Sequence, residues 1–290
     1  MTKRPGPVLV TGANSGIGLA TVLRFAQRGW ETWGTVRSAE KAAVLRDAAK
    51  DAKVAKHVHA FVLDVADDVA VTVAFADLPD FYAVVNNAGY SEVGAVEEVT
   101  AKEARAQLDV NLVAPAVVSG CALPGMRRLG GGRIVMVSSV AGRATLLPLN
   151  GWYHASKFGL EALSDVLRME VASFGVRVSI VEPGFFKTGI TDTARDRAEG
   201  RKDDTSPYES AYERTASLTD TIRRISPAPD AVARTIVSAV ESRAPLRRYL
   251  VGLDAYASVI TNALVPRGII DATARFVSDL NGKRVPEAQA

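Results

Sequence analysis

Residues 8–20 read VLVTGANSGIGLA, and this stretch decides the fold. A short apolar run at 8–10 enters a glycine-rich turn, and a helical pattern then extends from about Ile17 to Arg28 and stops at Gly29. In such a turn, glycines permit positive φ and a close backbone approach, so that amide groups and the helix N-terminus can face a pyrophosphate. An ordinary glycine-rich turn is the competing interpretation. The spacing is G-x-x-x-G-x-G rather than the usual G-x-G-x-x-G: Gly12, Gly16 and Gly18.

Short apolar runs alternate with helix-length segments along the whole chain. After the first run we expect strands at residues 31–36, 58–65, 81–85, 133–137, 176–181 and 248–252. Seven short strands separated by helices are typical of an α/β protein with a parallel sheet covered on both faces. The helix after Tyr153 has the clearest period, with apolar residues three or four apart and Gly175 where a helix usually stops: Leu160, Leu163, Leu167, Val171 and Phe174. Because no repeat or linker divides the chain, we expect a single domain over residues 1–290.

The composition excludes several classes of protein. The chain has 290 residues, of which 48% are hydrophobic and 23% charged, so it is neither disordered nor collagen-like, and one cysteine, Cys121, excludes a disulfide scaffold. A net charge of +3 is too close to neutral to indicate a nucleic-acid or membrane partner. Residues 1–7 do not resemble a secretory signal, and the densest apolar run near the C-terminus, 255–265, is interrupted by polar residues. We therefore expect a soluble, cytoplasmic protein with no membrane span.

One segment, from about Thr188 to Asp230, departs from the alternation because it is polar and rich in charge. A solvated surface excursion is one interpretation. We favour a substrate lid, because long loops in compact domains are often functional.

The end of the second expected strand bears on the choice of a dinucleotide. An acidic residue there binds the adenosine ribose of NAD, whereas an arginine can pair with the 2′-phosphate of NADP. The strand ends in Arg37 and Ser38, with no acid. Arg37 is therefore a candidate for the extra phosphate and Ser38 for a second donor, although a solvent-facing arginine is the competing interpretation.

Three further strand ends carry candidate ligand-binding residues, because open α/β sheets bind ligands at the carboxyl edge of their strands. Asp64, next to Val65, can bond an adenine amino group or cap a loop. Asn-Asn-Ala-Gly at 86–89 can brace the backbone around a cofactor and form a turn at the same time. Pro183-Gly184 and then Thr188 follow the sixth expected strand.

Tyr153 and Lys157 are four residues apart on one expected helix, so they lie on one face, one turn apart. A cation beside a phenol favours the phenolate. Lowering a tyrosine pKa from about 10 toward about 7 requires roughly 4 kcal/mol, more than we expect from one lysine, and a nicotinamide cation would add to the effect. The pair alone is common and usually indicates a surface contact.

Two more polar positions belong to this candidate site. Ser138-Ser139 ends the fifth expected strand, where a hydroxyl can bond a carbonyl oxygen or simply form a turn. Asn111 is a polar residue within an apolar helical stretch, which indicates either a satisfied core group or a water-binding one. The three histidines offer no convincing metal set, and we interpret His154, adjacent to Tyr153, as incidental.

Taken in order, these motifs resemble the short-chain dehydrogenase/reductase superfamily over roughly residues 6 to 190. They include the cofactor turn with its own glycine spacing, the Asn-Asn-Ala-Gly motif, Asn111, Ser139, Tyr-x-x-x-Lys and Pro-Gly with Thr188. The resemblance implies a doubly wound Rossmann fold, a three-layer sandwich around a seven-stranded parallel sheet. It implies that Tyr153 is the general acid/base, that Lys157 lowers its pKa and binds the nicotinamide ribose, that Ser139 orients the carbonyl, and that Asn111 holds a proton-relay water.

The resemblance also implies a set of residues that bind NADP(H), with NAD(H) as an alternative. That set is Gly12, Asn14, Ser15, Gly16, Ile17, Gly18, Arg37, Ser38, Asp64, Val65, Asn87, Ala88, Gly89, Tyr153, Lys157, Pro183, Gly184 and Thr188. A weaker likeness to hydroxysteroid and retinol dehydrogenases, carried by residues 148–150 and 181–186, suggests a ketoreductase acting on a hydrophobic ketone or secondary alcohol.

Two alternatives stay open at this point: a non-catalytic NADP(H)-sensing regulator, and an epimerase or dehydratase on the same fold. An intact Ser139, Tyr153 and Lys157 set argues against the regulator. The family resemblance further implies a homodimer or homotetramer.

Overall fold

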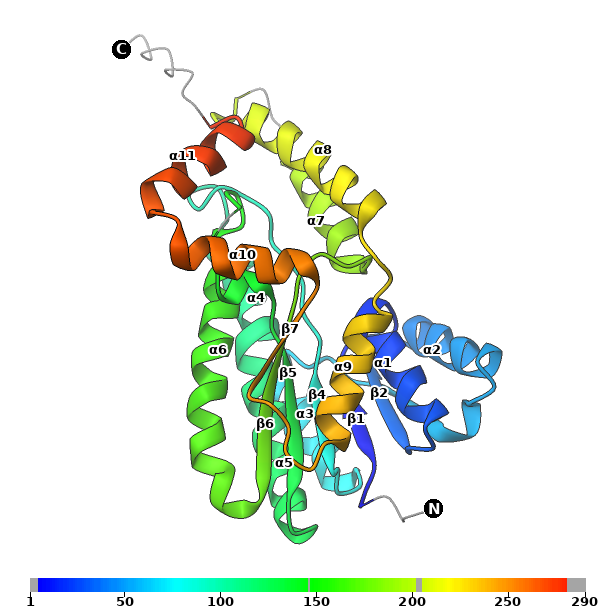
Figure 1. The fold of residues 1–290 in the computed structure, drawn as a ribbon. Coiled ribbons are helices and arrows are strands. Elements are labelled where there is room, and N and C mark those ends of the chain that lie inside the picture. The colour runs from blue at the N-terminus through cyan, green and yellow to red at the C-terminus, as the bar shows by residue number, and fades with distance from the viewer. Residues whose placement is uncertain (1–4, 146, 202–204, 281–290) are drawn as a thin grey trace.

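The computed structural model of the protein describes residues 5–145, 147–201 and 205–280 (Figure 1). Seven strands form one parallel sheet in the order β3-β2-β1-β4-β5-β6-β7. Their bounds are β1 Val8–Val10, β2 Thr32–Val36, β3 Val58–Val62, β4 Ala83–Asn86, β5 Gly132–Val137, β6 Val176–Pro183 and β7 Arg248–Val251. The predicted doubly wound three-layer fold is confirmed.

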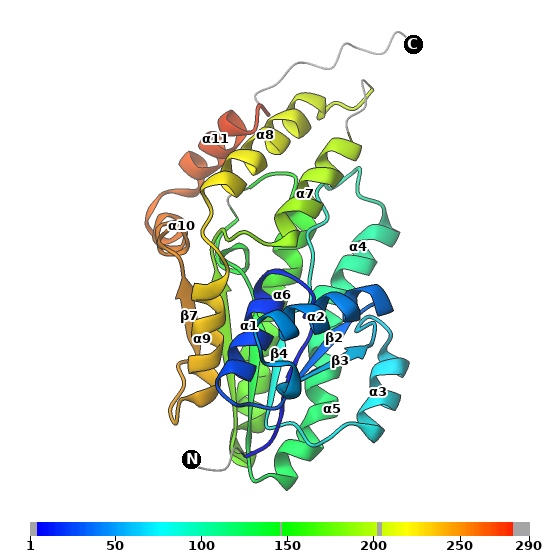
Figure 2. The ribbon, with the colours of Figure 1, turned by 90° about the vertical axis from the view of Figure 1, so that its right-hand side faces the viewer.

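Helices cover both faces of this sheet, and alternation along the strands explains why. Val8 and Val10 point into a core shared with α1, α2 and α9, whereas Leu9 between them points into a second core shared with α3, α5 and α6. Figure 2 shows α9 on one side of the sheet and α3 and α5 on the other. The helices are α1 Gly16–Gln27, α2 Ala39–Asp51, α3 Asp68–Asp77, α4 Ala101–Leu108, α5 Ala114–Arg128, α6 Gly151–Val171, α7 Gly189–Gly200, α8 Glu209–Ile225, α9 Asp230–Glu241, α10 Leu253–Leu264 and α11 Arg267–Val277.

The strand order reverses at β1, which pairs with β2 on one side and β4 on the other. In open parallel sheets such a reversal opens a crevice beyond the carboxyl ends of the two neighbouring strands, because the connections that follow these strands diverge. The glycine turn after β1 and the Asn-Asn-Ala-Gly segment after β4 therefore meet at this crevice.

Most expected boundaries agree with the structure within two residues, and the largest difference is at β3. This strand ends at Val62 rather than at residue 65. The chain leaves the sheet early because Asp64 accepts a hydrogen bond from the Ala66 amide at 3.0 Å and Asp67 caps α3 through the Ala70 amide at 2.8 Å. The strongest helical pattern in the sequence follows Tyr153 and stops at Gly175. Gly175 has φ of 72° and terminates the helical segment as predicted.

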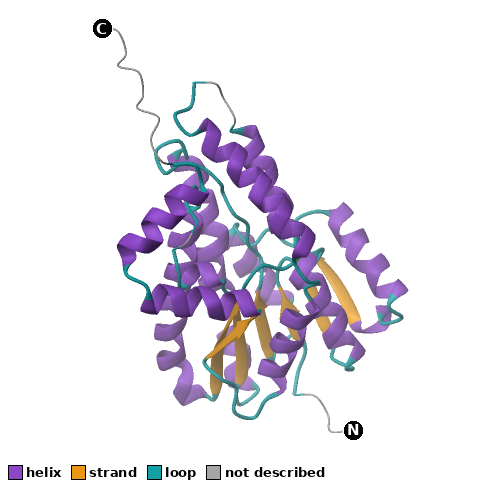
Figure 3. Ribbon diagram, turned by 45° about the horizontal axis from the view of Figure 1, so that its top comes forward, coloured by secondary structure: helices purple, strands orange, loops and turns teal. Residues whose placement is uncertain are grey.

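The polar segment after β6 is helical rather than an irregular loop. It contains α7 and α8, which pack through Ala198, Ala211, Tyr212 and Ala216 onto Val93 and Leu149. Together with α10 and α11 they lie beyond the carboxyl edge of the sheet (Figure 1), and Figure 3 shows helices gathered beyond one end of the strands.

One continuous helical stretch among the described residues, Ala101–Arg128, is long and apolar enough to span a membrane. It consists of α4, a π-helical turn at Asp109–Val113 and α5. Its residues Val118, Ala122 and Met126 are buried against the sheet, so we interpret it as a core helix. The apolar run at 255–265 mostly forms a different helix, α10.

Candidate active site

The turns after β1 and β4 are tied together by short polar side chains. The Thr11 hydroxyl accepts hydrogen bonds from the Asn87 and Ala88 amides, both at 2.9 Å. The Asn87 side-chain amide donates to the Thr11 carbonyl at 2.9 Å and the Gly12 carbonyl at 3.2 Å. These bonds hold the glycine turn in a fixed shape, which is the bracing role expected for the asparagine motif.

The glycine turn forms a cradle that side chains would fill. Gly12 and Gly16 adopt φ of 67° and 53°, a region that favours glycine. A Cβ on Gly18 would lie 2.6 Å from the Asn87 side-chain nitrogen, and one on Gly16 would lie 3.2 Å from Thr188 Cβ. The first turn of α1 carries no acidic residue, so its amide groups are suited to an anion. The residues present therefore fit a dinucleotide pyrophosphate, with Thr188 facing the turn from the other side.

The other predicted cofactor residues lie along the same edge with differing environments. Arg37 is exposed directly after β2, and Ser38 is the N-cap of α2, where it accepts a hydrogen bond from the Lys41 amide at 3.4 Å. Asp64 is exposed and caps the turn after β3, while Val65 is buried. Both interpretations of Asp64 therefore remain compatible with its position.

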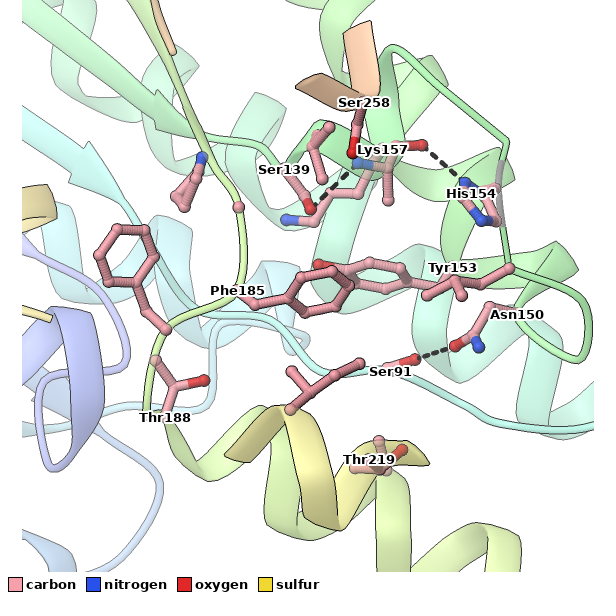
Figure 4. Close-up of a pocket in the computed structure, with 18 of the residues that line it drawn as sticks. Ser91, Ser139, Asn150, Tyr153, His154, Lys157, Phe185, Thr188, Thr219 and Ser258 are labelled. Carbon is pink, nitrogen blue, oxygen red and sulfur yellow. Dashed lines mark hydrogen bonds between the residues drawn. The ribbon is translucent and has the colours of Figure 1, made fainter. Parts of the chain in front are cut away.

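Ser139 and Tyr153 face one cavity of about 300 Å³ beyond the carboxyl ends of β5 and β6 (Figure 4). Ser139 is the N-cap of a short 3-10 turn, Val140–Gly142, and accepts a hydrogen bond from the Ala141 amide at 3.1 Å. Tyr153 lies in the first turn of α6, and the Ser139 hydroxyl is close enough to its phenol group to oppose the rise in the pKa of Tyr153. The predicted serine–tyrosine pair is thus assembled on one wall of the cavity.

Lys157 lies one turn further along α6 and is only 4% exposed. Its ammonium group donates to the Val137 carbonyl at 3.0 Å and lies 5.8 Å from the centre of the Tyr153 ring. Burial lowers the pKa of Lys157 from 10.5 to about 8, although the nearby Glu161 carboxyl opposes this shift.

The pKa of Tyr153 differs from our expectation. The protein's own groups raise it above its ordinary value of 10.0, because desolvation of the phenol outweighs the hydrogen bond from Ser139. The Lys157 ammonium group does not reverse this effect, since it lies 5.8 Å from the centre of the ring and donates to a backbone carbonyl instead.

Asn111 is fully buried within the π-helical turn between α4 and α5. Its side chain accepts a hydrogen bond from the Tyr90 amide at 3.0 Å and donates to the Tyr90 carbonyl at 2.8 Å and to Ser156 at 3.1 Å. A Cβ on Gly89 would lie 3.1 Å from Asn111 Oδ1 and 3.7 Å from Lys157 Nζ, so the amide and the ammonium group approach the same glycine. A π-helical turn at such a position is typical of functional sites.

The cavity wall also contains residues to which the sequence assigned no role in the chemistry. His154 is 8% exposed and its Nδ1 bonds to the Ala141 carbonyl at 2.8 Å, so it braces the Ser139 turn rather than being incidental. Ser91 donates to Asn150 at 2.9 Å on the same wall. Phe185, Phe186 and Leu218 make the lining predominantly apolar. No local motif marks Ser91 or Leu218, because tertiary packing alone brings them to the cavity, whereas Phe185 and Phe186 lie in the segment 181–186 that carried the likeness to retinol dehydrogenases.

Comparison with known proteins agrees with this geometry. The family model described as short chain dehydrogenase matches residues 7–199. The uncharacterized oxidoreductase YusZ of Bacillus subtilis is 33% identical over 89% of this chain and 93% of its own length. Human retinol dehydrogenase 5 is 32% identical over 93% and 88%, and the NADPH-dependent 3-dehydrocapnine reductase of Ornithobacterium rhinotracheale is 30% identical over 94% and 96%.

Solved structures resemble the whole chain. A short-chain dehydrogenase from Streptomyces avermitilis is 29% identical, with a TM-score of 0.75, and the match covers 98% of this chain and 100% of that one. A Burkholderia cenocepacia short chain dehydrogenase in complex with NADP, 22% identical with a TM-score of 0.70 over 93% and 97%, shares the fold.

Proposed function

This chain belongs to the short chain dehydrogenase family, and on that premise we propose that it is an NADP(H)-dependent oxidoreductase that interconverts a hydrophobic carbonyl compound and its secondary alcohol. The observation that carries this proposal is the junction of Ser139 and Tyr153 on one cavity wall with Lys157 one turn away. A regulator that only senses the cofactor has no need of this set.

NADP(H) is supported by the residues at the sheet edge. The cradle of Gly12, Gly16 and Gly18 with the α1 N-terminus would hold the pyrophosphate, and the exposed Arg37 would pair with the 2′-phosphate. One relative, the 3-dehydrocapnine reductase of Ornithobacterium rhinotracheale, carries NADPH dependence in its name.

The chain's residues orient the reacting carbonyl and supply a proton. Bound NADP(H) supplies or accepts the hydride. Ser139 donates a hydrogen bond to the carbonyl oxygen, and Tyr153 delivers a proton to that oxygen in reduction or removes one from the hydroxyl in oxidation. A raised pKa keeps Tyr153 protonated at neutral pH, which suits the reductive direction. Lys157 places a positive charge one turn away, and Asn111 fixes the adjoining backbone at Tyr90.

A hydrophobic substrate is supported by the lining of the cavity. Its wall is mostly apolar around Phe185, Phe186 and Leu218, while Ser139 and Tyr153 present hydroxyl groups to the same space.

We further propose that the whole chain is a single domain, that α7 and α8 form the substrate lid, and that the protein is a cytoplasmic homodimer or homotetramer.

The test is NADPH absorbance with a panel of hydrophobic ketones and aldehydes. We expect oxidation of NADPH by the wild type and almost none by Tyr153→Phe, with cofactor binding nearly unchanged because the substitution removes only the hydroxyl. Substantial turnover by Tyr153→Phe would contradict the assigned role, and cofactor binding by the wild type without any turnover would favour the regulator.

A further inference from the structure

A cluster of buried charges lies beside the active site, on the part of α6 that follows Lys157. Glu161 is 5% exposed and Glu182, on β6, is fully buried. Arg248, on β7, links them, since its Nε lies 3.1 Å from an oxygen of each carboxylate. Arg143 contacts Glu182 from the other side at 3.1 Å. Three elements far apart in the sequence thus join in one ionic network.

This network touches the catalytic segment through Glu161. Glu161 lies one turn beyond Lys157 on the same face of α6. A Cβ on Gly142 would lie 2.8 Å from Ser138 Oγ, 3.0 Å from the Lys157 carbonyl and 3.1 Å from Glu161 Cγ, so these residues surround the same glycine of the Ser139 turn. The Glu161 side chain and the Lys157 backbone therefore lie against the same turn that carries Ser139.

Glu161 is the acid of α6 nearest to Lys157 along the helix, one turn away. Desolvation and the neighbouring Glu182 raise the pKa of Glu161 to about 7, while the Ser138 hydroxyl and Arg248 oppose that rise. In turn, the Glu161 carboxylate counteracts the desolvation that lowers the pKa of Lys157. The other charged groups facing Glu161 are Asp165 on α6, which bonds to Arg248 at 2.6 Å, and Arg143 behind Glu182.

We propose that Glu161 is a positioning residue of the reaction, a buried counter-charge that keeps the Lys157 ammonium group protonated, with Arg248 and Glu182 fixing its carboxyl in place. This inference rests on the proposed role of Lys157 beside Tyr153. A positive charge on Lys157 favours proton release from Tyr153. Glu161 therefore sets the alkaline limb of the pH profile of kcat/KM although it does not touch the substrate.

The test uses the nearly isosteric substitution Glu161→Gln, which keeps the size of the side chain and removes its charge. The matched control is Asp165→Asn, which weakens a second contact of the same Arg248 but lies two turns from Lys157 and is 35% exposed. The readout is the pH dependence of Lys157 acetylation by acetic anhydride, measured by mass spectrometry of the peptide. This readout is independent of turnover, and the pH profile of kcat/KM is recorded alongside it.

We expect Glu161→Gln to lower the labelling midpoint of Lys157 by about one pH unit, which is a tenfold change in its protonation ratio. The alkaline limb of kcat/KM should shift in the same direction. Asp165→Asn should leave the labelling midpoint and the alkaline limb unchanged. Glu161→Asp keeps the negative charge, so its labelling midpoint should stay close to that of the wild type. A midpoint in Glu161→Gln that coincides with the wild type, or an equal shift in Asp165→Asn, would overturn the inference. If no carbonyl compound is turned over but the labelling shift occurs, only the proposed function fails.

A second variant covers the case in which Glu161→Gln does not fold. Glu161→Leu removes the same charge and leaves no unpaired polar group in the buried site, so it should lower the midpoint of Lys157 in the same way. An unchanged or raised midpoint would count against the inference.

Discussion

Replacing Lys157 by Met should stabilise the folded protein while removing its activity. The pKa of Lys157 falls from 10.5 to about 8 on burial, and at 1.36 kcal/mol per unit this charge lowers the free energy of unfolding by about 3 kcal/mol at neutral pH. Met removes that cost but leaves the Val137 carbonyl without its 3.0 Å donor, a loss of about 1 kcal/mol. The expected net gain at pH 7 is about 2 kcal/mol.

The pH dependence identifies the cause. Between about pH 8 and pH 10.5 the unfolded chain holds the lysine proton that the folded chain has lost, so the free energy of unfolding of the wild type rises with pH. The stability advantage of Lys157→Met therefore shrinks by about 1.4 kcal/mol per pH unit. Above pH 10.5 the variant should be the less stable protein, because only the lost hydrogen bond remains.

Urea unfolding at pH 7, 8.5 and 9.5 measures this difference, with the exposed Lys56→Met as the control, expected within about 0.5 kcal/mol of wild type. A Lys157→Met variant less stable than wild type at pH 7, or a stability gap that does not narrow as pH rises, would refute the reasoning.

Three further predictions concern the cofactor edge and the lid. Arg37→Ala should weaken NADPH binding by about 10- to 100-fold through the lost charge-assisted contact and leave NADH binding nearly unchanged, as measured by fluorescence titration; an equal loss for both would contradict the assignment. Gly18→Ala should weaken binding of either cofactor at least tenfold, because its Cβ would lie 2.6 Å from the Asn87 amide nitrogen, and unaltered affinity would show that the turn is not the cradle. Arg201→Met should lower the free energy of unfolding by about 2–4 kcal/mol, since Arg201 bonds to the Val93 carbonyl at 2.8 Å and to Glu103 at 2.8 Å and also contacts the buried Glu92. An unfolding curve that superimposes on wild type would show that this attachment of the lid contributes nothing.

Local sequence patterns are sufficient to predict the strands of the sheet and the residues near the strand ends. The apolar run at 8–10 with its glycine turn, and the period of the helix that stops at Gly175, depend on neighbours in the sequence, so they are visible without the structure. Because parallel strands place their carboxyl ends at one edge, the positions of Thr188 and Asn87 near the same turn follow from topology.

Long-range packing is what the sequence does not express. Charge-rich residues after β6 suggested a loop, but α7 and α8 are helical because small residues such as Ala198 and Ala211 allow close packing. His154 braces the Ser139 turn through the Ala141 carbonyl, a contact that no spacing in the sequence predicts. Arg248 is 87 residues from Glu161, so no spacing rule connects them.

The most direct test of the central claim is transfer of deuterium from NADPH labelled at nicotinamide C4, supplied as either epimer, to a hydrophobic ketone, read by mass spectrometry of the alcohol. The account predicts one deuterium on the carbinol carbon from one epimer with the wild type, and almost none with Tyr153→Phe. Binding of NADPH by the wild type with no deuterium in any product from either epimer would contradict it.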